Sequence, residues 1–379
     1  MRVMGLMSGT SADGVDAVLA EFHGSSRRPH WRILASAAHP YPPELRQRLI
    51  HAGQGAPLAA AAWLELAEEV SDAQAEAARL CDPAGLAELV GCHGQTVWHR
   101  PPSPDRQGAS WQLLLGPRLA QRLERPVIHD FRAADLALGG QGAPLVPATD
   151  AALLGSAGGW RALLNLGGIA NLTLLPPAAG PDRQEAVRGW DCGPANTLLD
   201  LAAQHYSDGE LGFDAGGAWA ASGAVAHELV VRWLREPYFR LDPPKSTGRE
   251  LFGAADLYRR LEDISEARPG HRPADALATL TAFSAAAIAQ DLRRGPAPIE
   301  LLVAGGGTRN LTLMQQLQRR CRGMRVRPLS ELGIADDQRE ALAFALLAWW
   351  HQRRHPGSLP SVTGAPRAAV LGVRADPSP

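Results

Sequence analysis

The first residues of the chain constrain its fold more than any other stretch. Residues 4–16 read MGLMSGTSADGVD, in which an apolar run leads into a polar turn, and a second apolar run over residues 15–22 leads out. This pattern predicts two strands joined by a turn. The glycines at positions 9 and 14 permit backbone angles that side chains would forbid. The chain is therefore expected to open on a β-hairpin with a polar tip.

The tip of this hairpin carries side chains of the kinds that can bind phosphate and magnesium. Thr10 and Ser11 supply hydroxyls, while Asp13 and Asp16 supply carboxylates. Such a turn can cradle phosphate with backbone N–H groups and hold magnesium through carboxylates and water. An ordinary polar hairpin has the same composition, and the turn alone does not separate the two interpretations.

Length and charge narrow the class of protein. A chain of 379 residues exceeds what one hydrophobic core usually serves, so two domains are expected. The net charge of −1 argues against binding nucleic acid or a membrane surface by bulk electrostatics. No apolar run approaches the roughly 20 residues that span a bilayer, and the N-terminus enters a strand directly, so a cytoplasmic protein is expected. The 4 cysteines are far apart without a CxxC pair, which indicates neither a disulfide framework nor a zinc site.

A polar motif follows the next predicted buried strand. Residues 86–92 are strand-like and run into His93, Gly94, Gln95 and Thr96. This order places an imidazole and an amide at the C-terminal end of a strand, where open α/β sheets form ligand crevices. A histidine whose hydrogen bonds are satisfied at the surface or in the core is the alternative interpretation.

The segment that follows combines a charged group with glycines. Residues 129–147 read HDFRAADLALGGQGAPLVP, and three glycines around a glutamine require irregular backbone, which is usually functional inside a compact domain. Arg132 offers a planar guanidinium suited to carboxylate or phosphate, with Asp130 and Asp135 near enough in sequence to orient it. A local salt-bridge cluster is the alternative.

The second half of the chain repeats the plan of the first. Residues 162–175 read ALLNLGGIANLTLL, two apolar runs around Gly167 and Gly168. Two glycine hairpins, each opening half of the chain, indicate an internal duplication whose turns could clamp one ligand from both sides.

Three further motifs of the second half are candidates for chemistry. In residues 189–197, GWDCGPANT, Asp191 is expected just outside a helix N-terminus, as a general base or as a helix cap. Residues 305–310, GGGTRN, follow a predicted strand, and such a turn lets a flat ring lie against the backbone or serves tight packing. Residues 243–250, PPKSTGRE, hold the single lysine of the chain, Lys245, which could contact an anion although the glycines of a Walker loop are missing.

The ordered set of these motifs, closed by a helix over residues 336–350 that carries Glu340, resembles the anhydro-N-acetylmuramic acid kinase family. These bacterial sugar kinases belong to the superfamily of acetate kinase, sugar kinases, Hsp70 and actin. The resemblance covers residues 4 to about 347. It implies an α/β fold with two ribonuclease-H-like, actin-like ATPase domains flanking a central nucleotide and substrate cleft. Domain I would comprise residues 1–128, completed by about 345–375, and domain II residues 129–344.

The resemblance also implies the reaction. The family phosphorylates 1,6-anhydro-N-acetylmuramic acid with ATP while water opens the anhydro bridge, giving N-acetylmuramic acid 6-phosphate and ADP in cell-wall murein recycling. ATP and Mg²⁺ are the implied cofactors. The implied partners are ATP and the anhydro sugar, with a cytoplasmic homodimer and no nucleic acid or membrane.

Matching the family's motifs residue by residue gives the expected site. Asp191 would deprotonate the attacking water and Glu340 would help to position it. Mg²⁺ would be held by Asp13 or Asp16. The residues expected to bind ATP and its phosphates are Gly9, Thr10, Ser11, Ala12, Asp13, Gly14, Val15, Asp16, Gly167, Gly168, Gly305, Gly306, Gly307 and Asn310. The residues expected to bind the sugar are His93, Gln95, Arg132, Asp135 and Asn171.

Two short segments depart from the family's pattern. Thr149 and Asp150 stand where an aromatic residue and a histidine are common, and the segment from Leu114 to Pro117 lacks the usual Gln and Asp around its glycine. These departures bear on contacts with the lactyl and acetamido groups of the sugar more than on phosphoryl transfer.

Two rival functions remain open. A kinase for a different sugar or for a carboxylate would use the same phosphate turns. A regulatory protein that opens and closes on ATP is the second rival, and the presence of both Asp191 and Glu340 argues against it because a pure binder needs no base.

Overall fold

The computed structural model describes residues 1–248 and 250–378. The chain divides into two compact units, the first formed by Met1–Leu154 together with the chain from Gly333 onward, and the second by Gly155–Leu332. The family resemblance predicts boundaries near 128 and 344 instead. The difference arises because α5 (Val146–Leu154) packs against β3 and α13 of the first unit.

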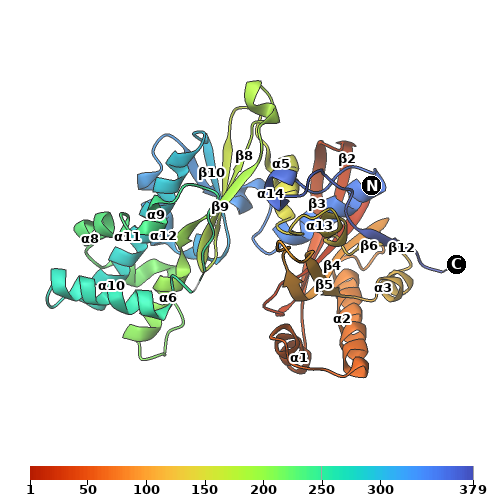
Figure 1. The fold of residues 1–379 in the computed structure, drawn as a ribbon, viewed down its shortest axis with the longest axis horizontal. Coiled ribbons are helices and arrows are strands. Elements are labelled where there is room, and N and C mark those ends of the chain that lie inside the picture. The colour runs from red at the N-terminus through yellow and green to blue at the C-terminus, as the bar shows by residue number, and fades with distance from the viewer. Residues whose placement is uncertain (249, 379) are drawn as a thin grey trace. The chain divides into compact units, whose positions relative to one another are not determined.

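The first unit is built on a mixed sheet (Figure 1). Its strands are β1 (Arg2–Ser8), β2 (Gly14–Ser25), β3 (Arg28–Pro40), β4 (Leu89–Arg100), β5 (Ala109–Leu113), β6 (Val127–His129) and β12 (Val373–Ala375). They lie in the order β12-β6-β4-β1-β2-β3, with β5 paired to β4. β1, β2 and β3 form an antiparallel meander, whereas β4 runs parallel to β1 and β6 runs parallel to β4.

Two long helices of the first unit cover opposite faces of this sheet. Met4 and Leu6 of β1 pack in one core with residues of α2, whereas Gly5, which points to the other face, lies against α13. The helices of this unit are α1 (Pro43–Gly53), α2 (Ala60–Cys81), α3 (Gly116–Leu123), α4 (Ala133–Ala137), α5 (Val146–Leu154), α13 (Arg339–Gln352) and α14 (Pro360–Thr363).

A pair of glycines lets α13 lie directly on the sheet. Gly5 of β1 and Gly91 of β4 face each other in the parallel register. A Cβ atom on either glycine would overlap a backbone carbonyl of α13, that of Ala341 or that of Phe344. The two glycines therefore set the depth at which the helix sits, and with it the position of Glu340 in its first turn.

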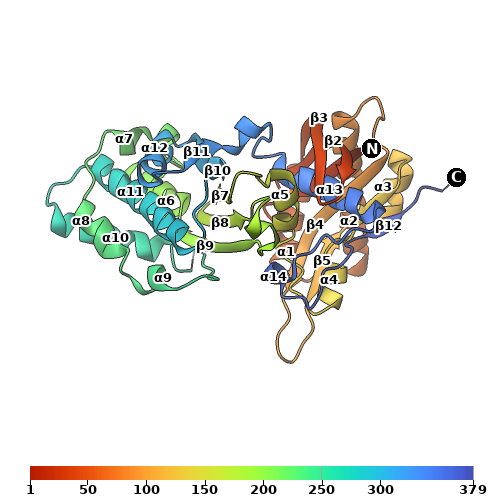
Figure 2. The same cartoon turned by 90° about the horizontal axis from the view of Figure 1, so that it is seen from above.

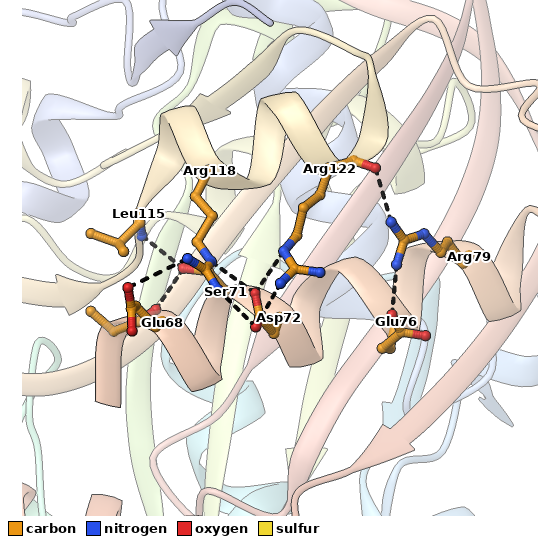
Figure 3. Close-up of polar contacts among 9 residues, drawn as sticks. Glu68, Ser71, Asp72, Glu76, Arg79, Leu115, Arg118 and Arg122 are labelled. Atoms are coloured by element: carbon orange, nitrogen blue, oxygen red, sulfur yellow. Dashed lines mark hydrogen bonds and ion pairs between the residues drawn. The ribbon is translucent and has the colours of Figure 1, made fainter. Parts of the chain in front are cut away.

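Helix α3 is fixed to α2 by polar contacts (Figure 3). Asp72 of α2 forms ion pairs with two arginines of α3: its Oδ1 lies 2.9 Å from Arg118 Nε and 2.8 Å from Arg122 Nε. The backbone N–H of Leu115 donates to Ser71 Oγ at 2.9 Å, just before α3 begins. Because the ion pairs are exposed to solvent, they orient α3 more than they stabilise it.

The sheet of the second unit repeats the topology of the first. Its strands are β7 (Arg161–Leu166), β8 (Ile169–Leu175), β9 (Arg188–Pro194), β10 (Glu300–Ala304) and β11 (Arg325–Pro328). Their order is β11-β10-β7-β8-β9, with an antiparallel meander of β7, β8 and β9, with β10 parallel to β7 and with β11 parallel to β10. This is the arrangement of β6-β4-β1-β2-β3, which is the ribonuclease-H-like topology. The internal duplication expected from the two glycine hairpins is thus confirmed in the strand order.

Helix α11 forms the centre of the second unit. Leu277, Leu280 and Phe283 belong to a core shared with the neighbouring helices, while Ala285 and Ile288 belong to the core under the sheet. Figures 1 and 2 show α6, α8, α10 and α11 as one helical group. The helices are α6 (Asn196–Tyr206), α7 (Ala218–Ala221), α8 (His227–Trp233), α9 (Pro237–Arg240), α10 (Ala254–Ala267), α11 (Pro273–Asp291) and α12 (Leu311–Arg320), with the 3₁₀ helices η1 (Pro181–Gln184), η2 (Ala215–Gly217), η3 (Leu292–Arg294), η4 (Gly306–Arg309) and η5 (Leu329–Leu332).

None of the helices in residues 1–248 and 250–378 combines the length and the apolar character that crossing a bilayer requires.

Candidate functional site

The predicted hairpin between β1 and β2 is present and its turn is tightly closed. The backbone N–H of Ala12 donates to Gly9 O at 3.1 Å, and Ala12 adopts a left-handed φ of 51°. Ser8 Oγ donates to Gly14 O at 2.8 Å and so joins the two ends of the turn. Thr10 and Ser11, in the segment between them, are exposed to solvent.

Gln95 binds this turn with both ends of its amide. Its Oε1 accepts from Ser8 Oγ at 2.5 Å, and its Nε2 donates to Gly9 O at 2.9 Å. The side chain is 2% exposed. Gln95 is predicted to contact the sugar, and in the structure its amide holds the turn between β1 and β2 in shape.

His93 is a buried acceptor for Arg132. Its Nε2 lies 2.9 Å from the Arg132 guanidinium, and its Nδ1 lies 2.8 Å from Gly94 O. Burial, together with the charge of Arg132, lowers the pKa of His93 to about 3. The ring is therefore neutral, accepts from the arginine and donates to the carbonyl.

Arg132 is not oriented by Asp130 and Asp135, so that part of the sequence interpretation is wrong. Its guanidinium is held by His93 and by Gly142 O at 2.8 Å. Asp135 is fully buried and holds the same glycine loop from the other side, because it accepts from Gly142 N at 2.9 Å and from Thr363 Oγ1 at 2.8 Å. Arg132 and Asp135 thus share the Gly142 loop rather than a salt bridge.

Asp16 is a partly buried carboxylate of the first unit with three acidic neighbours. Burial raises the pKa of Asp16 to about 6, and the negative charges of Asp337, Glu340 and Asp13 add to the effect. Asp13 differs from the others because Arg46 pairs with it at 2.8 Å. Over residues 1–248 and 250–378, no group of three or more His, Cys, Asp or Glu side chains is arranged to hold a metal ion by itself.

The departures from the family's pattern lie in packed structure. Asp150 is 1% exposed and binds Arg339 of α13 with both carboxylate oxygens. Thr149 is buried and donates to Val146 O at 2.7 Å. Asp150 therefore fixes the start of α13, one residue before Glu340.

The second departure, from Leu114 to Pro117, has a similar structural role. Leu114 packs against the core of the first unit, and Pro117 lies in the first turn of α3. Proline is favoured there because the N–H it lacks would have no partner within the helix.

A cavity of about 380 Å³ lies beside the turn between β1 and β2, within the first unit. Thr10 and Ala12 of the turn form one side, and the end of α1 forms another. Residues 95–99 of β4 complete the lining, including the half-exposed ring of Trp98.

In the second unit, Asp191 lies within β9, and α6 begins five residues later at Asn196. The expected position at a helix N-terminus is therefore wrong. Asp191 Oδ1 accepts from Asn171 Nδ2 at 2.8 Å, across the pair of strands β8 and β9. Asp191 Oδ2 accepts from Ser246 Oγ at 3.1 Å and from Thr247 N at 3.0 Å. The carboxylate is partly exposed and fixed by three donors.

The turn between β7 and β8 is fixed to the start of α6. Gly167 O and Gly168 O accept backbone N–H groups of residues 195–197 at 2.9 to 3.1 Å. Asn196 Nδ2 donates to Gly167 O at 2.8 Å. A Cβ atom on Gly168 would lie 2.6 Å from Thr197 Oγ1, so glycine is needed for this close approach.

The glycine triplet after β10 mainly serves close packing. Gly305 has a φ of +88°, and a Cβ atom on it would lie 2.6 Å from Asn165 Oδ1. A Cβ atom on Gly307 would lie 2.6 Å from the Leu166 side chain, whereas Gly306 has room. Asn310, expected at the nucleotide, caps α12 by accepting from Leu313 N at 2.9 Å.

Lys245 does not have the free ammonium group that an anion contact requires. Its Nζ lies 2.9 Å from Asp291 Oδ2, and both side chains are almost fully buried. Arg249 of the same motif lies outside the described residues.

Sequence reasoning missed four residues that shape the site. They are Ser8, Asn196, Ser246 and Thr247. Each lies within a few residues of a glycine turn or of the lysine motif, and short polar side chains that bind nearby backbone groups are typical of such positions.

The family model and the curated relatives that match this chain carry the same family description. The family model described as "Anhydro-N-acetylmuramic acid kinase" matches residues 1–376. Curated relatives with that name are 62% identical over 383 residues in both Synechococcus sp. (strain CC9605) and Prochlorococcus marinus (strain MIT 9303), each covering 100% of both chains. Among solved structures, the activator of 2-hydroxyisocaproyl-CoA dehydratase from Clostridium difficile with bound ADPNP aligns with a TM-score of 0.43 and 13% identity over 93% of this chain and 96% of that one.

Proposed function

This chain belongs to the anhydro-N-acetylmuramic acid kinase family, and we propose that its activity rests on Asp191 as the base that activates water. The enzyme phosphorylates 1,6-anhydro-N-acetylmuramic acid with ATP and opens the anhydro ring with water, giving N-acetylmuramic acid 6-phosphate and ADP in murein recycling. The observation that supports the base assignment is the Asp191 carboxylate, fixed by three donors yet partly exposed.

The proposed reaction joins attack of water on the sugar to transfer of the γ-phosphoryl group. Asp191 takes a proton from water, and the water oxygen bonds to the anomeric carbon while the bond from that carbon to the bridging oxygen breaks. The bridging oxygen becomes the 6-oxygen of the sugar and attacks the γ-phosphorus of ATP, and ADP leaves. Since an Asp191 carboxylate held by Asn171, Ser246 and Thr247 keeps one orientation, it can meet the water without first reorganising.

The glycine turns of the two units are proposed to bind the phosphates of ATP. In the first unit, Gln95 and Ser8 fix the backbone of residues 9–14, so that its amides need no ordering when phosphate arrives. In the second unit, Gly167 and Gly168 direct their carbonyls to the start of α6. The room at Gly306 supports an approach of the nucleotide there.

Five residues expected at the sugar are proposed to act in two ways. Arg132 is partly exposed, and its planar guanidinium is proposed to bind the sugar or the transferring phosphoryl group. His93 positions Arg132, and Asp135 positions the loop at Gly142. Gln95 positions the turn between β1 and β2, and Asn171 orients Asp191.

The cavity beside the phosphate turn is proposed to receive the sugar. Its volume of about 380 Å³ suits a ligand of the size of one modified sugar. Trp98 offers an apolar face, and Thr10 and Thr96 offer hydroxyls for hydrogen bonds to the sugar.

The donor groups of the first unit fit a magnesium ion that is carried mainly by ATP. Mg²⁺ prefers one or two carboxylates together with phosphate and water oxygens, so a cage of three side chains is not required. Asp16 is the better anchor, because its charge is disfavoured by burial and by its acidic neighbours, whereas Asp13 is already paired with Arg46. When bound, Mg²⁺ would neutralise charge on the phosphates during transfer.

Replacing Asp16 by Asn is expected to stabilise the ligand-free protein while impairing its use of magnesium. The pKa of Asp16 is raised in the folded state, so folding favours the protonated carboxyl. The folded protein loses stability as pH rises through about 6, because the buried carboxyl then becomes charged. An uncharged amide at this position avoids that loss. At pH 7.5 without Mg²⁺, the Tm of D16N should exceed the wild-type Tm by about 2 °C. Half-saturation with Mg²⁺ should require a higher concentration.

Scanning calorimetry at pH 7.5 and pH 5 measures this effect, and the gain should shrink at the lower pH. D13N is the matched control, because it removes a carboxylate that Arg46 already pairs. An equal rise in Tm for D16N and D13N would contradict the view that the charge of Asp16, unlike that of Asp13, destabilises the ligand-free protein.

The reaction itself is tested with isotopic water. Incubation with ATP, Mg²⁺ and 1,6-anhydro-N-acetylmuramic acid in H₂¹⁸O should give a sugar product with one phosphate and one ¹⁸O at the anomeric carbon, as measured by mass spectrometry. A phosphorylated sugar without ¹⁸O would exclude attack by water on that carbon. Unchanged sugar, with no ADP formed, would point to a different substrate.

The family also leads us to propose a homodimer and a cytoplasmic location. Light scattering after size-exclusion chromatography, in which a monomer mass would count against the dimer, tests the first.

A further inference from the structure

Asp291 is a buried acid whose contacts lead to the proposed base. It is the last residue of α11 and its side chain is 1% exposed. It accepts from Lys245 Nζ at 2.9 and 3.1 Å and from Trp190 Nε1 at 3.2 Å. Arg294 lies 2.9 Å away. A buried ion pair of this kind is weak evidence for stability alone, because desolvation offsets much of the attraction.

Two of the residues that contact Asp291, Trp190 and Lys245, are directly connected to Asp191 or to its hydrogen-bond donors. Trp190 precedes Asp191 on β9, so its indole ties that strand to the end of α11. Lys245 precedes Ser246 and Thr247, which hold Asp191 Oδ2.

The backbone of Asp191 is held by the same group of residues. Its N–H donates to Lys245 O at 3.0 Å, and its carbonyl accepts from Tyr238 Oη at 2.7 Å. The Lys245 ammonium lies 4.7 Å from the centre of the Tyr238 ring. The buried pair therefore fixes the segment that orients both the backbone and the carboxylate of Asp191.

We propose that Asp291 and Lys245 are positioning residues for catalysis, because their buried pair holds residues 245–247 in the place where they orient the Asp191 carboxylate. This inference rests on the proposed role of Asp191 as the base. Positioning groups of this kind are typically worth 10- to 100-fold in activity.

The test compares two variants that each replace a buried acid by its amide. Asp291→Asn removes the charge that holds Lys245. Glu300→Gln is the matched control, since Glu300 is a buried acid of the same unit that pairs with Arg161 at 2.8 Å and with Arg327 at 2.5 Å, at the start of β10. Both variants should lower the Tm, whereas only D291N should lower kcat, by about 30-fold, with KM for ATP and sugar changed less than about twofold.

A second variant removes one contact without disturbing the buried pair. Ser246→Ala removes a single donor from Asp191, so kcat should fall about 5- to 10-fold and the acidic limb of the kcat profile should move to higher pH. Ser246→Thr, which keeps the hydroxyl, should restore both. The ionisable groups that interact electrostatically with Asp191, Tyr238 and Cys192, are unchanged in this variant, as is the buried pair of Lys245 and Asp291.

The outcomes separate this inference from the proposed function. Loss of turnover in D191N together with wild-type kcat in D291N would overturn the positioning role alone. Full turnover in D191N would overturn the base and with it the positioning role. An equal loss of kcat in D291N and E300Q, or an unchanged pH profile in S246A, would show that the pair of Asp291 and Lys245 supports the fold only and does not position Asp191.

Discussion

Asp191→Asn should reduce kcat by about 1,000-fold or more while ATP binds with nearly unchanged affinity. General-base catalysis contributes roughly 10²- to 10⁴-fold, and an amide cannot take a proton from water near neutral pH. The fold should tolerate the change. The oxygen of the new amide can still accept from Ser246 and Thr247, and Asn171 can turn its own amide to receive the new N–H group.

The measurement combines steady-state turnover with calorimetric titration of ATP. Glu185→Gln serves as the control, because it neutralises an exposed carboxylate three residues before β9. This carboxylate pairs locally, with Arg188 at the start of the strand. A D191N enzyme with turnover within a few-fold of wild type would remove the base assignment. Loss of ATP affinity together with turnover would show that the substitution disturbs the nucleotide site instead.

Gly91→Ala should destabilise the first unit by about 3 kcal/mol, which corresponds to a fall in Tm of roughly 10 °C for a unit of this size. The added methyl would overlap the Phe344 carbonyl and crowd the Ala348 side chain, so α13 must move away from the sheet. Both obstacles are parts of a buried helix, which cannot yield as an exposed side chain would.

Calorimetry is the suitable measurement, because two units need not unfold in one transition. Gly53→Ala in α1 is the matched control in the same unit. A Cβ atom there would lie 3.7 Å from Val97 O, an ordinary van der Waals contact, so the Tm of G53A should stay within about 2 °C of wild type. A G91A protein with wild-type Tm would show that α13 is not as closely seated as described.

The elements that carry local signals were predictable from the sequence. Both glycine hairpins were recognised because apolar runs flank each turn, and their repetition led to the duplicated topology. The position of Asp191 was missed because register is not local. Its partner Asn171 lies on another strand, and two further donors come from residues 246–247.

The roles of the polar motif residues were harder to predict, for a related reason. Gln95 and His93 stand in a motif that suggests ligand contact, yet burial turns their polar atoms toward Ser8, Gly9 and Arg132. Glycine triplets are equally ambiguous, since Gly305 provides a left-handed turn and a close approach to Asn165. Only the assembled backbone shows which polar atoms already have partners.

The position of α13 in the sequence determines when the first unit can finish folding during synthesis. The helix that covers Gly5 and Gly91 begins at Arg339, after every residue of the second unit has been made. A nascent chain ending at residue 332 thus contains all of the second unit but lacks one face of the first, which leaves apolar sheet surface open to chaperones or to aggregation. The sheet of the first unit can be covered on that face only after α13 has been made, so the second unit is the one equipped to fold first.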